Sequence, residues 1–123
     1  MNKHIISISL VAALIFASCG VKEKVEKAQE EAAGTFSDQG FKGAIALIEL
    51  YNVRYGHYPA SMDSLTFTSN FDAMAIQSVV YQRLDTGYRL DIANSIVNGK
   101  TPELQYPSEF WQGTGVKQSN LLK

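Results

Sequence analysis

The chain has 123 residues, and its 11 basic and 12 acidic side chains give a net charge of −1 at pH 7. This balance argues against a nucleic-acid partner, because nucleic-acid affinity comes mostly from basic side chains that neutralise phosphates. The length suits one domain rather than two. A single cysteine allows no disulfide within the chain.

The first 18 residues have the organisation of an export signal. Lys3 supplies a positive charge, and an almost wholly apolar run follows from Ile5 to Phe16. At about 1.5 Å per residue this run reaches only about 18 Å, well short of the ~30 Å hydrocarbon core of a bilayer. We therefore expect residues 1–18 to be a signal peptide that is removed, and not a membrane span.

The only cysteine follows this leader directly, in the series Ala17-Ser18-Cys19-Gly20. The series resembles the lipobox of bacterial lipoproteins, although Phe16 stands where that family usually carries Leu, Val or Ile. The resemblance implies a diacylglyceryl group on the Cys19 sulfur and often a third chain, such as palmitate, on its amine. A thioether also explains a lone cysteine better than a free thiol does in an oxidising compartment. The alternative is an ordinary secretory leader cut near this point.

An acylated Cys19 would hold the mature protein on a membrane of the bacterial cell envelope, since two or more acyl chains give stable attachment. By the same resemblance, Gly20 favours the outer membrane, facing the periplasm, because many lipoproteins of the inner membrane carry Asp there. Removal of residues 1–18 takes away Lys3 and no acidic residue, which leaves 10 basic and 12 acidic side chains.

Residues 19–35 are expected to form a charged tether, helical or flexible, that begins with the lipidated cysteine. Oppositely charged pairs four residues apart, such as Glu23 with Lys27, support a solvated helix. The apolar repeat is too thin to bury much area, and consists of Val21, Val25, Ala28 and Ala32. A short coiled coil or a helix that binds a partner is the alternative, although it needs more heptads.

The globular domain is predicted over residues 36–123 and begins with an amphipathic helix. The helical period of three and four residues is seen at Phe41, Ala44, Ile45, Ile48, Tyr51, Asn52 and Tyr55, and Leu47 and Leu50 widen the apolar face. Ser37 or Asp38 is predicted to cap the start of this helix, and Gly56 to end it in the left-handed conformation. Residues 59–65 are predicted to form a loop with one short helical turn.

The second half predicts a sheet. Residues 76–84 and 88–92 are predicted strands of a hairpin, joined by a turn in which Gly87 supplies a positive φ. The helix-facing side of the second strand is predicted to consist of Tyr88, Leu90 and Ile92, with Arg89 and Asp91 toward water. A turn at 98–99 leads to a possible third strand at 103–106, and the chain beyond Trp111 is expected to be a loose tail.

The predicted fold class is therefore α+β, with one amphipathic helix packed on a small antiparallel sheet. The ordered series Ala46 to Tyr51, Tyr55-Gly56-His57-Tyr58-Pro59, Thr86 to Leu90 and Tyr106-Pro107 is similar to the head of the type II secretion major pseudopilin and other type IV pilin-like domains. The resemblance covers roughly residues 41–93 and implies that the helix leads through a Gly-x-Tyr-Pro turn into the sheet. Pilin subunits have an apolar N-terminal helix where this chain has a charged tether. Because unpaired charges in an apolar fibre core are costly, no filament assembly is expected.

Few residues suit catalysis or metal binding. His57 is the only histidine beyond the leader, which excludes a two-histidine metal site, and we expect it to be a turn residue, with a base or ligand role as the alternative. Ser61 and Ser64 lie nearby, but the chain has no Gly-x-Ser-x-Gly motif. Asp85 and Asp91 flank the hairpin without the dense run of oxygen ligands that calcium needs. No catalytic residue, metal or cofactor is predicted.

Aromatic residues near the C-terminus are the remaining functional signal. Tyr106, Phe110 and Trp111, with Pro107 among them, are predicted to form a docking patch for a protein or a glycan if they stay partly exposed. The alternative is that these three side chains are buried in the core. We therefore expect a non-enzymatic lipoprotein whose head binds another envelope protein or a ligand, as an accessory part of a secretion or pilus system. A small envelope hydrolase is the alternative.

Overall fold

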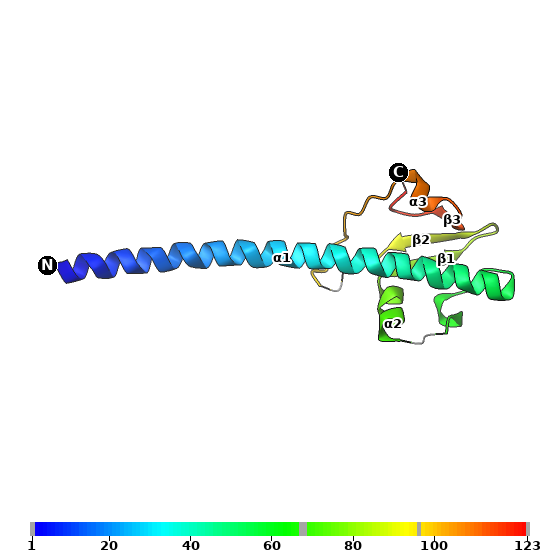
Figure 1. Ribbon diagram of the computed structural model, residues 1–123, viewed down its shortest axis with the longest axis horizontal. Helices are drawn as coiled ribbons and strands as arrows, with labels where there is room; N and C mark the ends of the chain where they lie inside the picture. The colour runs from blue at the N-terminus through cyan, green and yellow to red at the C-terminus, as the bar shows by residue number, and fades with distance from the viewer. Residues whose placement is uncertain (1, 67–68, 96, 123) are drawn as a thin grey trace. The chain divides into compact units, whose positions relative to one another are not determined.

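The computed structural model describes residues 2–66, 69–95 and 97–122, with the side chains from Gly20 onward except that of Phe71. In chain order its elements are α1 (Asn2–Tyr55), η1 (Met62–Ser64), α2 (Asn70–Gln77), β1 (Val79–Arg83), β2 (Tyr88–Ile92), α3 (Ser108–Trp111) and β3 (Val116–Gln118) (Figure 1). The chain divides into two compact units, residues 1–32 and 33–123. Among the described residues, none of the helices is both long and apolar enough to cross a membrane.

Residues 20–32 of the first unit are helical, and every one of their side chains is exposed. Val21 and Val25 are among the exposed apolar residues. A helix with this composition is stabilised by good helix formers such as Ala, Glu and Lys, and not by burial of an apolar face.

The second unit has the predicted α+β class, with α1 packed on a small sheet. The helix buries the predicted face at Phe41, Ala44, Ile45 and Ile48. The predicted cap was wrong, because Ser37 and Asp38 lie inside α1, which begins at Asn2. The residues upstream favour a helix, so no terminus exists at Ser37 to be capped.

The C-terminal end of α1 follows the prediction at its glycine. Gly56 has a φ of +77° and donates its N–H to the carbonyl oxygen of Asn52 at 2.8 Å. The predicted apolar face was too wide, however, because Tyr55 is 61% exposed and Leu50 is 46% exposed. Only one side of a helix meets a flat sheet, and Leu50 points away from that side.

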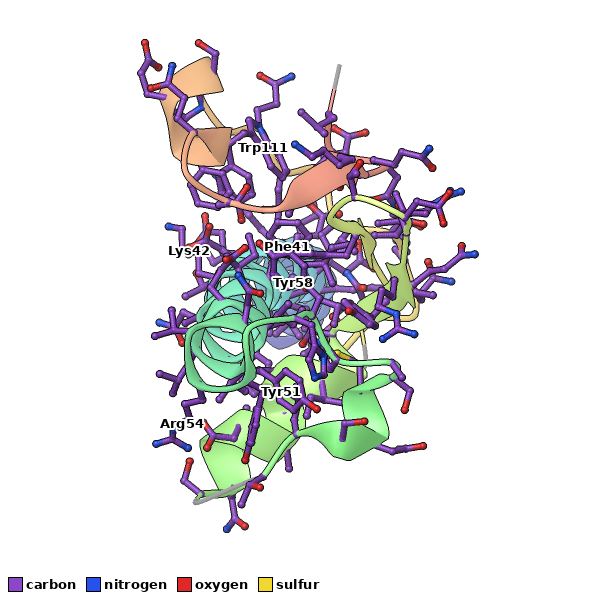
Figure 2. All side chains as sticks on the ribbon, turned by 90° about the vertical axis from the view of Figure 1, so that its right-hand side faces the viewer. Phe41, Lys42, Tyr51, Arg54, Tyr58 and Trp111 are labelled. Atoms are coloured by element: carbon purple, nitrogen blue, oxygen red, sulfur yellow. The ribbon has the colours of Figure 1, made fainter. Side chains whose placement is uncertain are left out.

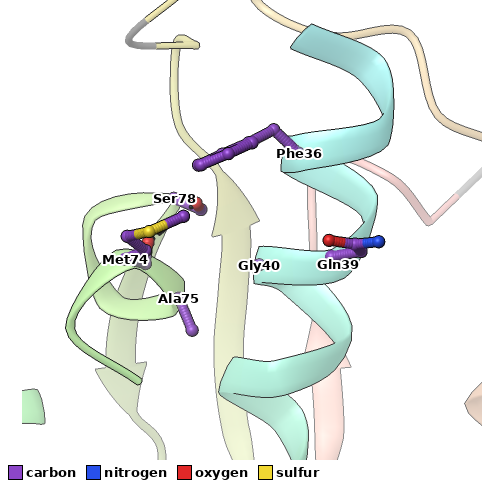
Figure 3. A pocket seen from close by; sticks show the side chains of 6 residues that line it. All are labelled: Phe36, Gln39, Gly40, Met74, Ala75 and Ser78. Carbon is purple, nitrogen blue, oxygen red and sulfur yellow. Dashed lines mark hydrogen bonds between the residues drawn. The ribbon is translucent and has the colours of Figure 1, made fainter. Parts of the chain in front are cut away.

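The chain after the helix contains the predicted short helical turn, η1, and a helix that was not predicted, α2. Ser69 caps α2 by accepting the Asp72 N–H at 3.3 Å. Ile76 lies in α2 and not in a strand as predicted, so β1 begins at Val79. A side chain on Gly40 would collide with that of Ser78, so glycine at this position allows the end of α2 to lie close to α1. The cavity that remains has a volume of about 10 Å³. Figure 3 shows the residues that line it.

The sheet has the strand order β1-β2-β3, and it is mixed and not wholly antiparallel as predicted. β1 and β2 form the predicted antiparallel hairpin, in which Gly87 has a φ of +80°. β3 pairs with β2 in parallel. Residues 103–106 belong to no strand, and the expected loose tail instead supplies β3. Parallel pairing joins segments far apart in the sequence and leaves no local turn signal.

The core lies between α1 and the sheet. Tyr88, Leu90 and Ile92 are buried on the helix-facing side, as predicted, whereas Arg89 is exposed. Val116 and Leu121, from the part of the chain expected to be loose, join the same cluster.

Asn120 attaches the C-terminal segment to β2. Its side-chain Oδ1 accepts the Ile92 N–H at 2.9 Å, and its Nδ2 donates to the Ile92 carbonyl oxygen at 3.1 Å. Its own N–H donates to Asp91 at 2.8 Å. The asparagine thus replaces the main-chain hydrogen bonds that a neighbouring strand would make, and it extends the ordered structure to Leu121.

Candidate functional site

The structure brings together the three aromatic residues that were predicted to form a docking patch. Pro107 precedes α3 in an extended conformation, with a ψ of 158°, and Phe110 and Trp111 lie in the short helix. The ring centroids of Tyr106 and Phe110 lie 4.1 Å apart in a stacked arrangement, and those of Phe110 and Trp111 lie 5.1 Å apart in a T-shaped one. All three side chains are partly buried. They also pack against the core cluster, so their role as a docking patch stays a prediction.

Phe41 of α1 supports this cluster from the core side. Its ring centroid lies 5.8 Å from that of Tyr106 and 5.9 Å from that of Trp111. Phe41 and Trp111 are labelled in Figure 2. The Tyr106 hydroxyl donates to Asp38 Oδ1 at 2.7 Å. Burial, together with this bond to a carboxylate, raises the pKa of Tyr106 well above its ordinary value. The inner edges of the rings are therefore part of the core, and their orientation is held by packing.

A groove of about 310 Å³ opens beside the cluster, lined by Gln105, Tyr106, Ser108, Trp111, Leu121 and Leu122. Its volume is at the lower end of the range for small-ligand sites, about 300–1,000 Å³. Phe110 does not line it, because its ring stacks against Tyr106. Sequence reasoning missed the two leucines, of which Leu121 is buried and Leu122 is exposed.

Polar groups in the groove are available for a ligand. Within the described chain, the Gln105 amide, the Ser108 hydroxyl and the Trp111 indole N–H form no hydrogen bond. An apolar wall with a few free donors and acceptors is the usual composition of a small-ligand site. Among the described residues that line the groove, none is a histidine, a cysteine, an aspartate or a glutamate.

A second set of contacts, missed by the sequence analysis, centres on Glu49 and holds the C-terminal segment that carries Leu121 and Leu122. Glu49 Oε1 accepts the Gly115 N–H at 2.7 Å and the Tyr88 hydroxyl at 3.0 Å, and Oε2 accepts the Tyr58 hydroxyl at 3.0 Å. One carboxylate therefore joins α1, the turn after it, β2 and the residue before β3. The available signal was the position of Glu49, one turn after Ile45 on the edge of the buried face.

The pKa values of the tyrosines around Glu49 are raised above the ordinary value for tyrosine. Burial, aided by the bond to Glu49, raises the pKa of Tyr58 to about 12. Burial also raises the pKa of Tyr81 to about 12, and its hydroxyl donates to the Pro59 carbonyl oxygen at 2.6 Å. The pKa of Tyr88 rises further still, chiefly because its hydroxyl is buried. Since these tyrosines stay neutral, they act as hydrogen-bond donors that stabilise the fold.

The residues considered for catalysis are not assembled into a site. His57 is exposed in the turn, where its Nδ1 lies 3.1 Å from the Tyr58 carbonyl oxygen. Asp91 pairs with Arg89 at 2.9 Å. Within the described chain, His57 has no serine or carboxylate partner, and no three side chains of His, Cys, Asp and Glu converge. The predicted lipidation site, the Cys19 sulfur, lies outside the described side chains.

The chain was compared with family models, curated proteins and solved structures. None of the three comparisons gives a match. The likeness to pseudopilin heads therefore stays a prediction from the residue series, and the function is inferred from the groove and the N-terminal sequence.

Proposed function

We propose that the protein is a non-enzymatic lipoprotein of the bacterial cell envelope that is anchored through an acylated Cys19 and binds an envelope protein or ligand through the groove beside Trp111. Its pilin-like head is then an accessory part of a secretion or pilus system. The outer membrane, facing the periplasm, is the favoured location. The proposal includes no nucleic-acid partner and no filament assembly.

The groove provides the main support for a binding role. Tyr106 and Trp111 offer large aromatic surfaces, and such residues are enriched among those that dominate binding energy. Because both rings rest on Phe41, little side-chain entropy remains to be lost when a ligand binds. The free polar groups of Gln105 and Ser108 can then orient the ligand.

A crosslinking experiment in cells tests the binding role. A photo-reactive side chain at Ser108, which lines the groove, is expected to give one defined adduct. The matched control is the same group at Val53, which is 79% exposed on α1 and does not line the groove. The adduct should disappear in Trp111→Ala. Equal adducts from both positions, or none from Ser108, would contradict the proposal.

The anchor is tested separately. Cys19→Ser should abolish acylation, lower the mass of the mature protein and release it from the membrane fraction, because only a thiol forms the thioether. The control is Ser18→Ala, which keeps a small residue before the cysteine and should leave acylation intact. A Cys19→Ser protein of unchanged mass that still sediments with membranes would exclude the anchor.

Two variants separate binding from a hydrolase function. His57→Ala should leave partner capture and cell phenotype unchanged, since the histidine has no described catalytic partner. Trp111→Ala should abolish both. The opposite pattern, with a folded His57→Ala protein losing function, would favour the hydrolase.

A further inference from the structure

Residues 101–107, which supply part of the groove lining, belong to no strand but have the burial pattern of one. From residue 101 to 107 the side chains alternate, with the odd-numbered ones exposed and the even-numbered ones partly buried. Leu104 and Tyr106 pack against the core cluster. An alternation of period two is typical of an extended strand with one buried face. The same residues, 103–106, were predicted from the sequence to form a strand.

The main chain of this segment is unpaired. The Lys100 carbonyl oxygen accepts the Ser95 N–H, and the Pro107 carbonyl oxygen accepts the Phe110 N–H. Between these two bonds, within the described chain, no N–H or C=O group of residues 103–106 forms a hydrogen bond. An extended segment with a free row of donors and acceptors is a template for another strand.

The surroundings of the segment indicate what such a strand would carry. Gln105 and Tyr106 also line the groove, so an incoming strand would place a side chain between Tyr106, Trp111 and Leu121. Glu103 and Glu109 are exposed beside it, and neither forms an ion pair in the described chain. An apolar side chain fits the groove, and a basic side chain complements the two carboxylates.

We infer that the ligand of the groove is an extended peptide that adds as a strand along residues 103–106, with an apolar side chain in the groove and a basic side chain facing Glu103 or Glu109. This inference rests on the proposed binding function and specifies its ligand. Pro102 and Pro107 lack N–H groups and so confine pairing to four residues, which makes recognition depend on the groove as well as on the main chain. A glycan would contact the rings of Tyr106 and Trp111 and would leave the main-chain N–H and C=O groups of residues 103–106 without hydrogen-bond partners.

The inference is tested by selecting peptides from a random short-peptide library against the full-length protein. The selected peptides should share one apolar and one basic position. Their affinity should fall about tenfold or more in Trp111→Ala. The double variant Glu103→Gln with Glu109→Gln, which keeps the shape of both side chains, should weaken binding and reduce its dependence on salt. The matched control is Glu26→Gln on the exposed helix, which should change nothing.

Hydrogen exchange reports on strand addition directly. Because successive residues of a strand point their N–H groups to opposite edges, a bound peptide should slow exchange at either Glu103 and Gln105 or Leu104 and Tyr106, and not at all four. Methylation of alternate peptide nitrogens should abolish binding in one register and spare it in the other.

The outcomes separate this inference from the proposed function. Peptides that bind through Trp111 without protecting any amide of residues 103–106 would overturn strand addition and leave the binding function standing. Binding to an array of soluble oligosaccharides that depends on Trp111, with no peptide selected from the library, would also overturn strand addition and leave the binding function standing. If neither peptides nor oligosaccharides bind and Ser108 forms no crosslink, both fail together.

Discussion

Replacement of Glu49 by alanine should cause the largest loss of stability among single polar substitutions in the head. The carboxylate accepts hydrogen bonds from Gly115, Tyr88 and Tyr58. Without it, the Gly115 N–H and the Tyr88 hydroxyl stay buried and unpaired, at about 1–3 kcal/mol each. Tyr58 is partly exposed and can turn toward water. We therefore expect a loss of about 2–6 kcal/mol, from a total that is about 5–15 kcal/mol for domains of this kind.

The assay is urea unfolding, followed by the fluorescence of the single tryptophan, Trp111, and by circular dichroism. Glu49→Gln is the matched variant, because its oxygen can still accept from Gly115 and Tyr88 while its amide donates to the Tyr58 hydroxyl. It should lose less than half as much as Glu49→Ala. Glu26→Ala, in the exposed part of α1, should stay within about 0.5 kcal/mol of the parent. A Glu49→Ala protein that is equally close to the parent would refute the role given to this carboxylate.

Three further results are expected from the same unfolding assay. Gly115→Ala would place a methyl group against the Tyr58 ring and hydroxyl and should lower the free energy of unfolding by about 1–3 kcal/mol. Gly34→Ala, whose new methyl group has nothing close to it in α1, should raise the free energy of unfolding by about 0.5–1 kcal/mol. Equal effects of the two substitutions would contradict this packing. Asn120→Ala should release the C-terminal segment from β2, so rapid hydrogen exchange is expected across β3, and unchanged exchange would show that other contacts hold it. Because folding raises the pKa of Tyr58 and Tyr81 from 10.0 to about 12, their contribution is complete below pH 10 and should be lost between pH 10 and 12; a flat denaturation midpoint across that range would contradict it.

Several features were predictable because the signal is local. The buried face of α1 follows from a period of three to four residues, and the hairpin follows from alternation around Gly87. Gly56 and Gly87 both adopt the positive φ that their turns require. The α+β class needed no more than these elements, since a helix with one apolar face and a hairpin with one apolar face bury each other.

The candidate site was only half predictable. Tyr106, Phe110 and Trp111 were recognised from their residue types and spacing, and the structure does cluster them. The groove also needs Leu121, which lies far enough along the chain that no periodicity links it to Tyr106. The strand predicted at 103–106 has the expected alternation of exposed and partly buried side chains, but it pairs with no strand of the described chain. Pairing depends on which segment packs beside it, and the local sequence does not specify that.

The sequence alone was enough for the local elements and for the expectation of an anchor at Cys19, because each depends on neighbouring residues or on a short motif. Tertiary structure alone decided that Glu49 accepts hydrogen bonds from Gly115, Tyr88 and Tyr58, and that the supposed tail forms β3 and lines the groove with its two leucines. The contacts of Glu49 with Tyr88 and Gly115 join residues 39 and 66 positions apart. Their partners are chosen by how the helix and sheet pack, and a pattern within one segment carries no record of that choice.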